Sequence, residues 1–203
     1  MPHPFFSLPR ALKPAVFFEQ LLPTWPLKLP RISLPVRVAY RLEGGGVWTV
    51  SLLNGKLQVQ TGEVPPIHLQ VTMTEAHFRE ALVGALHERH LEILDRLDLP
   101  QELPDLSQLK VDPARIEAAL ALGGSIAVVI RDREYADRYR YVFTLGHAPA
   151  AYTHATTTIE LDADDLVTLG AAQTPPMKVL VSGKLRLAGD VGLPQRILSA
   201  LMH

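Results

Sequence analysis

The chain has 203 residues, of which 47% are hydrophobic and 20% charged, and its formal net charge is -1. This composition is typical of a soluble globular protein, and the balanced charge argues against a broad basic surface for nucleic acid, leaving only a local patch open. The absence of cysteine excludes disulfides, thiolate nucleophiles and Cys-based metal sites. Residues 118–130, the longest mainly apolar run, are too short to span a bilayer, and the N-terminus lacks the pattern of a secretory signal. We therefore predict a cytoplasmic protein that binds no nucleic acid.

The first 35 residues form an N-terminal arm of distinct composition. They hold eight of the chain's 17 prolines, together with several Phe residues, one Trp and more basic than acidic side chains. Residues 14–22 are predicted to form a helix, because Pro14 suits its first turn and Pro23 ends it. Two interpretations stay open: the arm packs across the domain, or it makes transient contact with a membrane or covers a lipid tunnel.

Residues 36–71 have the period-two alternation of a strand meander. Gly44-Gly45-Gly46 turns the chain after the first strand, and Asn54-Gly55 is a strong hairpin signal after the second. A fourth strand then leads to Thr74, which suits the N-cap of a helix bearing Phe78 and Leu82. The segment is predicted to be four strands followed by a helix.

The same pattern recurs 88 residues later. Adding 88 takes Val38 to Ile126 and Val71 to Ile159, although the middle of the segment needs a shift of three more. We predict an internal repeat, with chance similarity between two amphipathic meanders as the alternative. The predicted divisions are an arm at residues 1–35 and two units at residues 36–122 and 123–203, packed as one globular body.

Two helices are predicted between the strand-rich segments. Residues 85–97 carry apolar side chains at helical spacing. Residues 114–122 follow Asp112-Pro113, an N-cap with Pro at the first helical position, and Gly123-Gly124 ends them.

Residues 156–190 combine an unusual series of signals. An alternating strand ends at Asp162, an expected N-cap, with two further aspartates in the first helical turn. Pro175-Pro176 begins a second short helix, which Gly183 ends. One more strand closes with Gly189-Asp190, and a C-terminal helix is predicted over residues 194–202.

Two junctions in this stretch, Ser182-Gly183-Lys184-Leu185 and Leu187-Ala188-Gly189-Asp190, resemble those of the sterol carrier protein 2 family, the small lipid-binding domains. The resemblance covers residues 156–202 well and extends loosely to a Trp-containing hairpin at residues 36–62. It implies an α+β fold with an antiparallel-rich β-sheet and short helices packed on one face. It also implies an apolar tunnel that holds fatty acyl chains, sterols or other lipids.

Residues that could carry catalysis are few. His87 and His90 lack an identifiable third ligand, so an exposed helix face is favoured over a metal site. Helix capping is favoured over acid–base chemistry for the acidic group Asp162, Asp164 and Asp165. Neither a phosphate-binding loop nor a nucleophile elbow occurs, and nothing in the sequence indicates an enzyme or a cofactor.

We therefore expect non-catalytic binding or transfer of a hydrophobic ligand in an apolar tunnel. One alternative is a scaffold protein whose cavity is filled by side chains. Another is an accessory subunit for an enzyme acting on a hydrophobic substrate, such as an isoprenoid quinone precursor. Met177 and the C-terminal helix are favoured as tunnel walls, because that end borders the tunnel in the resembled family. The residues predicted to line the tunnel are Trp48, Phe78, Leu82, Tyr141, Phe143, Leu166, Met177, Leu180, Val181 and Ile197.

Overall fold

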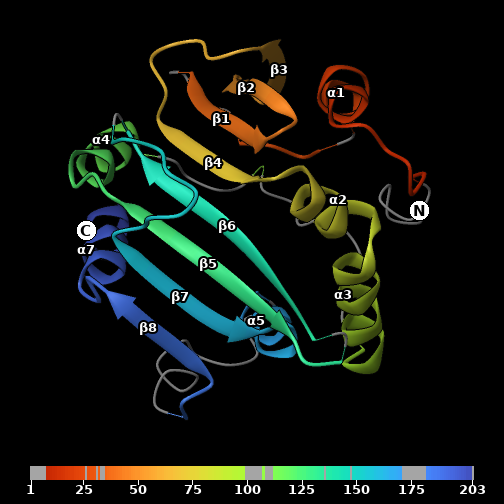
Figure 1. The fold of residues 1–203 in the computed structure, drawn as a ribbon. Coiled ribbons are helices and arrows are strands. Elements are labelled where there is room, and N and C mark those ends of the chain that lie inside the picture. Colours follow the sequence, from red (N-terminus) through yellow and green to blue (C-terminus); the bar gives the residue numbers. More distant parts are fainter. Residues whose placement is uncertain are drawn as a thin grey trace.

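A computed structural model describes residues 8–25, 27–30, 32, 35–98, 107, 112–134, 136–146, 148–170 and 182–202. Within these residues, eight strands form one sheet in the order β3-β2-β1-β4-β6-β5-β7-β8 (Figure 1). Five of the neighbouring pairs are antiparallel, whereas β1 with β4 and β5 with β7 are parallel. The strands are β1 (Val36–Glu43), β2 (Gly46–Leu53), β3 (Lys56–Thr61), β4 (Leu69–Thr74), β5 (Ser125–Asp132), β6 (Asp137–Leu145), β7 (Thr157–Asp162) and β8 (Leu185–Gly189).

Short helices complete the fold, and the predicted α+β class with an antiparallel-rich sheet is confirmed. The arm is helical where the sequence predicts it, but its turns change type along three short segments. In Figure 1 the helices α4 and α7 lie together at one end of the sheet, and α2 and α3 lie at the other. The helical segments are α1 (Pro14–Val16), η2 (Phe17–Leu21, a π-helical turn), η3 (Leu22–Thr24, 3₁₀), α2 (Glu75–Val83), α3 (Ala85–Arg96), α4 (Pro113–Ala121), α5 (Ala163–Gly170) and α7 (Leu193–Met202).

Local sequence signals explain several element boundaries. Asn54 and Gly55 have φ angles of 52° and 75°, as the two central residues of a type I′ hairpin turn require. Thr74 caps α2 by accepting a hydrogen bond from the backbone N–H of His77 at 3.1 Å. Asp112 does the same for α4 through Ala114, at 3.0 Å. These three predictions are confirmed.

The two strand-rich segments pair in the same way. Val38 lies opposite Leu69 in the parallel pair β1–β4, and Ile126 lies opposite Thr157 in β5–β7, which is the same register displaced by 88 residues. The second strands of the two hairpins, β2 and β6, are also equivalent, but the offset between equivalent residues differs from the one that the sequence suggests. Trp48 lies opposite Tyr40 and Tyr141 lies opposite Val128, so Trp48 corresponds to Tyr141 rather than to Tyr139. An evolutionary duplication stays a prediction.

The two halves of the sheet are joined through β4 and β6. Leu69 to Thr72 of β4 pair antiparallel with Leu145 to Val142 of β6, so a first-half strand is the direct neighbour of a second-half strand. Beyond this pairing, His77 at the start of α2 lies against β6, where its Nδ1 is 3.2 Å from the backbone nitrogen of Arg140. The sheet is therefore continuous across the middle of the chain.

The main hydrophobic core lies on one face of this sheet. Trp48, Val71 and Tyr141 of the strands belong to the same buried cluster as Phe18 of the arm and Ile93 of α3. Residues of α2 and α5 complete that cluster. The arm is thus part of the core, which agrees with the interpretation that it packs across the domain.

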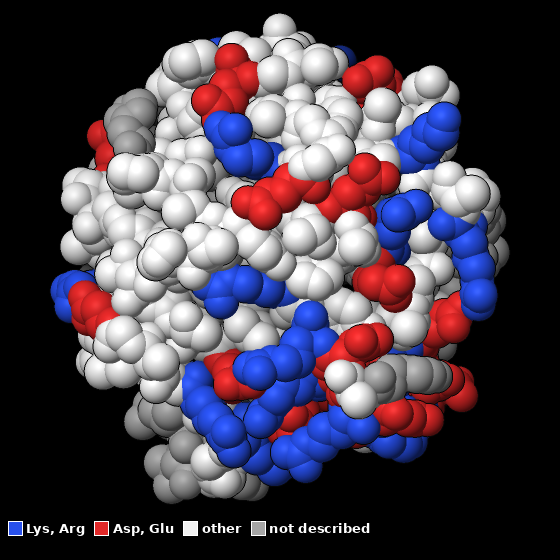
Figure 2. Space-filling model, in the orientation of Figure 1, with Lys and Arg blue, Asp and Glu red and all other residues white. Residues whose placement is uncertain are grey.

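Connections and charged side chains occupy the opposite face. Residues 62–68 cross it between β3 and β4, where Thr49 Oγ1 donates to the carbonyl of Gly62 at 2.7 Å. Figure 2 shows basic and acidic side chains mixed over the lower part of the face turned to the viewer. Several of them pair across strands, including Arg138 with Glu160 at 2.5 Å and Arg131 with Asp162 at 3.0 Å. The charged side chains on this part of the face therefore largely compensate one another.

Three aspartates at the start of α5, Asp162, Asp164 and Asp165, form ion pairs with basic side chains of several elements. Helix capping, the role predicted from the sequence, does not account for these ion pairs. Asp164 accepts from Arg96 at 2.7 Å and from Arg89 at 3.1 Å, both on α3. Asp165 lies 2.8 Å from Lys184, and Asp162 pairs with Arg131 of β5. The aspartates therefore fasten α5 to α3 and to the neighbouring strands.

Replacing Asp164 by Asn is expected to make the stability of the protein less dependent on pH in the acid range. Burial opposes ionisation of Asp164, but the hydrogen bonds and charges of Arg96 and Arg89 hold its pKa below the ordinary value. A lowered folded-state pKa stabilises the protein above the ordinary value of about 3.9, and that contribution is lost as the pH falls through the folded-state pKa. Because the side chain is 43% exposed, we expect about 1 kcal/mol or less. Urea unfolding should show a larger difference between wild type and Asp164→Asn at pH 7 than at pH 3; an equal difference at both pH values would contradict this assignment.

Candidate functional site

An apolar row crosses four strands of the second half. Val128 lies opposite Tyr141 on one side and Ile159 on the other, and Ile159 lies opposite Leu187. Directly opposed residues point to the same face of a sheet, so these four side chains form one continuous surface. Phe143 and Ile126 form the next pair along the strands on this face.

Several of these side chains are partly exposed although all except Leu187 lie on interior strands of the sheet. Towards α5, the neighbouring row is buried, with Ile130 at 5% and Leu161 at 3% exposure. Val128, Ile159 and Leu187 are only partly buried, as are Ile126 and Phe143. We call these five residues the second-half apolar face. Central-strand positions on the core side of a sheet are ordinarily covered, so accessible apolar surface here is a candidate ligand surface.

The first half has the corresponding row, but the arm covers it. Trp48 lies opposite Tyr40, and Tyr40 lies opposite Val71, in the same pairings that join Tyr141, Val128 and Ile159. Trp48 and Val71 are 4% and 5% exposed. The ring of Phe18 from the arm lies 4.9 Å from that of Trp48 and 5.1 Å from that of Tyr40.

Polar groups beside the second-half apolar face are uncharged at neutral pH. The hydroxyl of Tyr141 donates to the carbonyl oxygen of His77 at 3.1 Å, and burial raises its pKa above the ordinary value. Burial, reinforced by the nearby Asp137, raises the pKa of Tyr139 to about 12. Both phenols therefore stay protonated, and the surroundings suit an apolar ligand better than an ionic one.

The predicted lining residues fall into separate groups. Trp48 and Phe78 are buried against Phe18 of the arm, and Leu82 packs against the same cluster. Tyr141, Phe143 and Leu166 lie in the part of that cluster that belongs to the second half. Ile197 is partly buried on α7. The remaining three, Met177, Leu180 and Val181, lie outside the described residues.

Sequence reasoning missed four members of the second-half apolar face: Ile126, Val128, Ile159 and Leu187. Each lies in a stretch whose alternation marks a strand, so their inward direction could be inferred. Their position beside one another depends on the pairing of β5 with β7 and of β7 with β8, which alternation alone does not determine.

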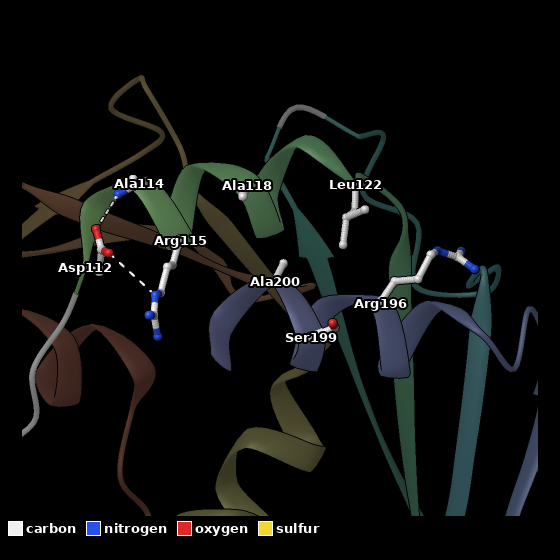
Figure 3. A pocket seen from close by; sticks show the side chains of 8 residues that line it. All are labelled: Asp112, Ala114, Arg115, Ala118, Leu122, Arg196, Ser199 and Ala200. Carbon is white, nitrogen blue, oxygen red and sulfur yellow. Dashed lines mark hydrogen bonds and ion pairs between the residues drawn. The ribbon is translucent and has the colours of Figure 1, made fainter. Parts of the chain in front are cut away.

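Two pockets among the described residues have different linings. One, of about 640 Å³, is an open groove between α4 and α7, into which Ala118, Leu122 and Ala200 project (Figure 3). At its end Asp112 pairs with Arg115 at 3.5 Å. The other, of about 300 Å³, is lined by charged residues of α3, α5 and the β5–β6 turn, in the ion-pair group around Asp164. Neither contains a predicted tunnel residue.

Comparison with known proteins assigns a family to the part of the chain that carries the second-half apolar face. Residues 105–202 match the SCP-2 sterol transfer family. This match lies within the C-terminal half of the chain. The SCP-2 region contains α4, β5 to β8, α5 and α7, and the sequence resemblance to the sterol carrier protein 2 family is thereby confirmed.

Solved structures of the same family also align with the chain. The apo form of sterol carrier protein 2 from Yarrowia lipolytica is 13% identical, with 45% of this chain and 79% of that chain covered and a TM-score of 0.33. Sterol carrier protein 2 like 2 from Aedes aegypti is 13% identical, with 56% and 94% covered and a TM-score of 0.32. A palmitated form of the Aedes aegypti protein is 14% identical, with 46% and 96% covered and a TM-score of 0.33. No curated protein matches the chain. The match to the SCP-2 sterol transfer family supports lipid or sterol binding or transfer.

Proposed function

We propose that this protein binds a hydrophobic ligand, such as a fatty acyl chain or a sterol-like molecule, on the second-half apolar face and releases it chemically unchanged. The observation that carries the proposal is a partly exposed apolar row in the sheet of the SCP-2 region, formed by Val128 and Ile159 on interior strands and Leu187 on the edge strand β8. Of the predicted tunnel residues, Tyr141 lies opposite Val128 and Phe143 opposite Ile126. Leu166 of α5 stays a proposed wall. Met177, Leu180, Val181 and Ile197 remain proposed walls on the strength of the sequence.

Burial of an acyl chain supplies enough free energy for such binding without polar recognition. Each buried methylene contributes about 0.8 kcal/mol, so about ten methylenes contribute roughly 8 kcal/mol before the cost of ordering the chain and the protein. That gross value corresponds to micromolar affinity at best. The neutral phenols of Tyr139 and Tyr141 add no charge that would oppose an apolar chain.

Replacing Leu187 by Trp is expected to weaken the binding of a fluorescent fatty acid by about tenfold or more, because the larger side chain occupies space on the apolar face. Leu187 lies in β8 at the edge of the sheet, where a larger residue disturbs few neighbours. Arg186→Trp is the matched control, since Arg186 is the exposed preceding residue and points to the opposite face. The measurement is a fluorescence titration of wild type and both variants, with melting temperatures to verify folding.

Equal weakening by both variants would contradict the assignment of this face. No binding by the wild-type protein to fatty-acid, sterol and isoprenoid probes would overturn the carrier proposal. That outcome would favour the scaffold or accessory-subunit hypothesis. One observation favours this second function, because it indicates a surface for a protein partner. Within the described residues, the exposed large hydrophobic side chains all lie at α4 or at the β8–α7 end: Leu122, Val191, Leu198 and Leu201.

Membrane contact and a cytoplasmic location stay predictions from the sequence. Transient membrane contact through the arm would have to use residues other than Phe17 and Phe18, which are 6% and 1% exposed. Among the described residues, no helix is long and apolar enough to cross a bilayer. A cytoplasmic location stays a prediction from composition.

A further inference from the structure

Phe18 of the arm sits between aromatic rings in the first half of the sheet. Its ring stacks on Trp48 at 4.9 Å with an interplanar angle of 12°, and on Phe78 of α2 at 5.4 Å and 24°. Only 1% of Phe18 is exposed. The rings of Trp48 and Phe78 thus form two walls around the ring of Phe18. We call the space between these walls the slot, and a ligand ring of similar size would fit it.

Phe17 closes the same slot from the side. Its ring lies edge-on to those of Phe78 at 5.3 Å and Trp25 at 5.2 Å. The backbone carrying both Phe residues is irregular, because three α-helical residues are followed by the π-helical turn Phe17–Leu21 and a 3₁₀ turn. Single π-helical turns are uncommon and often occur at functional sites.

One polar group of the arm reaches into the slot beside the two rings. The Oε1 atom of Glu19 accepts a hydrogen bond from Trp48 Nε1 at 2.9 Å and one from Thr61 Oγ1 at 3.2 Å. Glu19 itself is exposed. The arm therefore supplies a flat apolar ring together with an acceptor oxygen at its edge.

The slot corresponds in position to the proposed ligand site of the second half. Phe18 lies on the row formed by Trp48 and Tyr40, whose pairing recurs in Tyr141 and Val128. In the second half this row is partly exposed at Ile159, whereas its first-half counterpart Val71 is 5% exposed and the ring of Phe18 lies 5.1 Å from that of the adjacent Tyr40. The arm thus takes the place that a ligand would take on the equivalent surface.

We propose that the first half of the sheet is a second ligand site, closed here by the chain's own arm acting as an intramolecular ligand. The walls select a flat apolar ring that carries a hydrogen-bond acceptor at its edge, with Phe18 standing in for the ring and the Glu19 carboxylate for the acceptor. This inference goes beyond the proposed function because the site lies outside the family match and is formed by other residues.

Phe18→Ala is expected to open this site to 1-naphthoic acid, a flat aromatic ring bearing a carboxylate. The chain's two tryptophans, Trp25 and Trp48, both lie at the slot, so intrinsic fluorescence reports on it directly. The variant should bind the probe one to one with a change in tryptophan fluorescence. Its affinity should exceed that of the wild type by about tenfold or more, since in the wild type only the fraction with a displaced arm can bind. A folded Phe18→Ala protein with no fluorescence response, or with the wild-type affinity, would overturn the proposal.

A pair of Glu19 variants keeps the test decisive where Phe18→Ala fails to fold. Glu19→Ala removes the acceptor oxygen but leaves both Phe residues, whereas Glu19→Gln retains an acceptor. Glu19→Ala should bind naphthoic acid roughly fivefold more tightly than Glu19→Gln, because its arm is held less firmly. Equal affinities would count against the arm as a competing ligand. Because the readout comes from Trp25 and Trp48, failure of the fatty-acid titration at the second-half apolar face leaves this result interpretable.

Discussion

A chain without residues 1–26 is expected to lose most of its stability and to bind a hydrophobic dye strongly. Deletion removes Leu12, Phe17 and Phe18, which are 3%, 6% and 1% exposed in the core. Loss of a buried Phe side chain costs about 3–5 kcal/mol, and a whole domain is stable by only about 5–15 kcal/mol. Urea unfolding of the two chains measures the loss, and dye fluorescence measures the apolar surface that becomes accessible.

Point variants separate the contribution of the buried rings from that of the arm as a whole. Phe18→Ala alone should cost about 3–5 kcal/mol. Gln20→Ala, at an exposed position two residues away, should change the free energy of unfolding by less than about 0.5 kcal/mol. A truncated chain with the urea midpoint and dye signal of the wild type would mean that the arm contributes nothing to the core.

Gly189→Ala is expected to be the most damaging small substitution in the second half, at about 4 kcal/mol. Gly189 has a φ of +81°, and a Cβ atom there would lie 2.3 Å from the backbone oxygen of Thr156, which cannot move aside easily. That oxygen also accepts a hydrogen bond from the N–H of Asp190 at 2.9 Å. Differential scanning calorimetry should show a large fall in melting temperature.

Gly62→Ala provides the matched control. Gly62 has a φ of +86°, close to that of Gly189, but a Cβ atom there would meet nothing within 4 Å. The control should therefore show only the cost of left-handed backbone geometry, about 1–2 kcal/mol. Equal destabilisation by the two substitutions would show that the contact with Thr156 is unimportant.

Local signals in the sequence predicted the elements well because their causes are local. The Asn54-Gly55 turn, the Thr74 cap and the start of α4 at Asp112-Pro113 each depend on residues within a few positions of one another. Gly189-Asp190 likewise ends β8 in a turn, where Asp190 Oδ1 accepts from the backbone N–H of Gly192 at 3.0 Å. The motif that carries the family resemblance is thus a structural one.

Contacts between distant residues could not be predicted in this way. Alternation shows which side chains of β6 share a face, but it does not show which residue of the neighbouring strand lies opposite each of them. The sequence therefore matched Trp48 with Tyr139, whereas strand pairing makes it equivalent to Tyr141. The insertion of Phe18 beside Trp48 joins positions 30 residues apart with no pattern linking them. Asp164 looked like a helix-cap residue because its arginine partners lie on α3, far away in the sequence.

The junction between β4 and β6 has a consequence for synthesis on the ribosome. When β4 has emerged, its pairing with β1 can form, but the residues that cover its other edge, from Val142 to Leu145, come about 70 residues later. At about 5–20 residues per second, that edge waits on the order of several seconds for its neighbour. An unpaired edge strand can pair with other chains, so the nascent first half is the species most prone to misassembly. A chaperone that covers β4 during this interval should therefore raise the yield of folded protein.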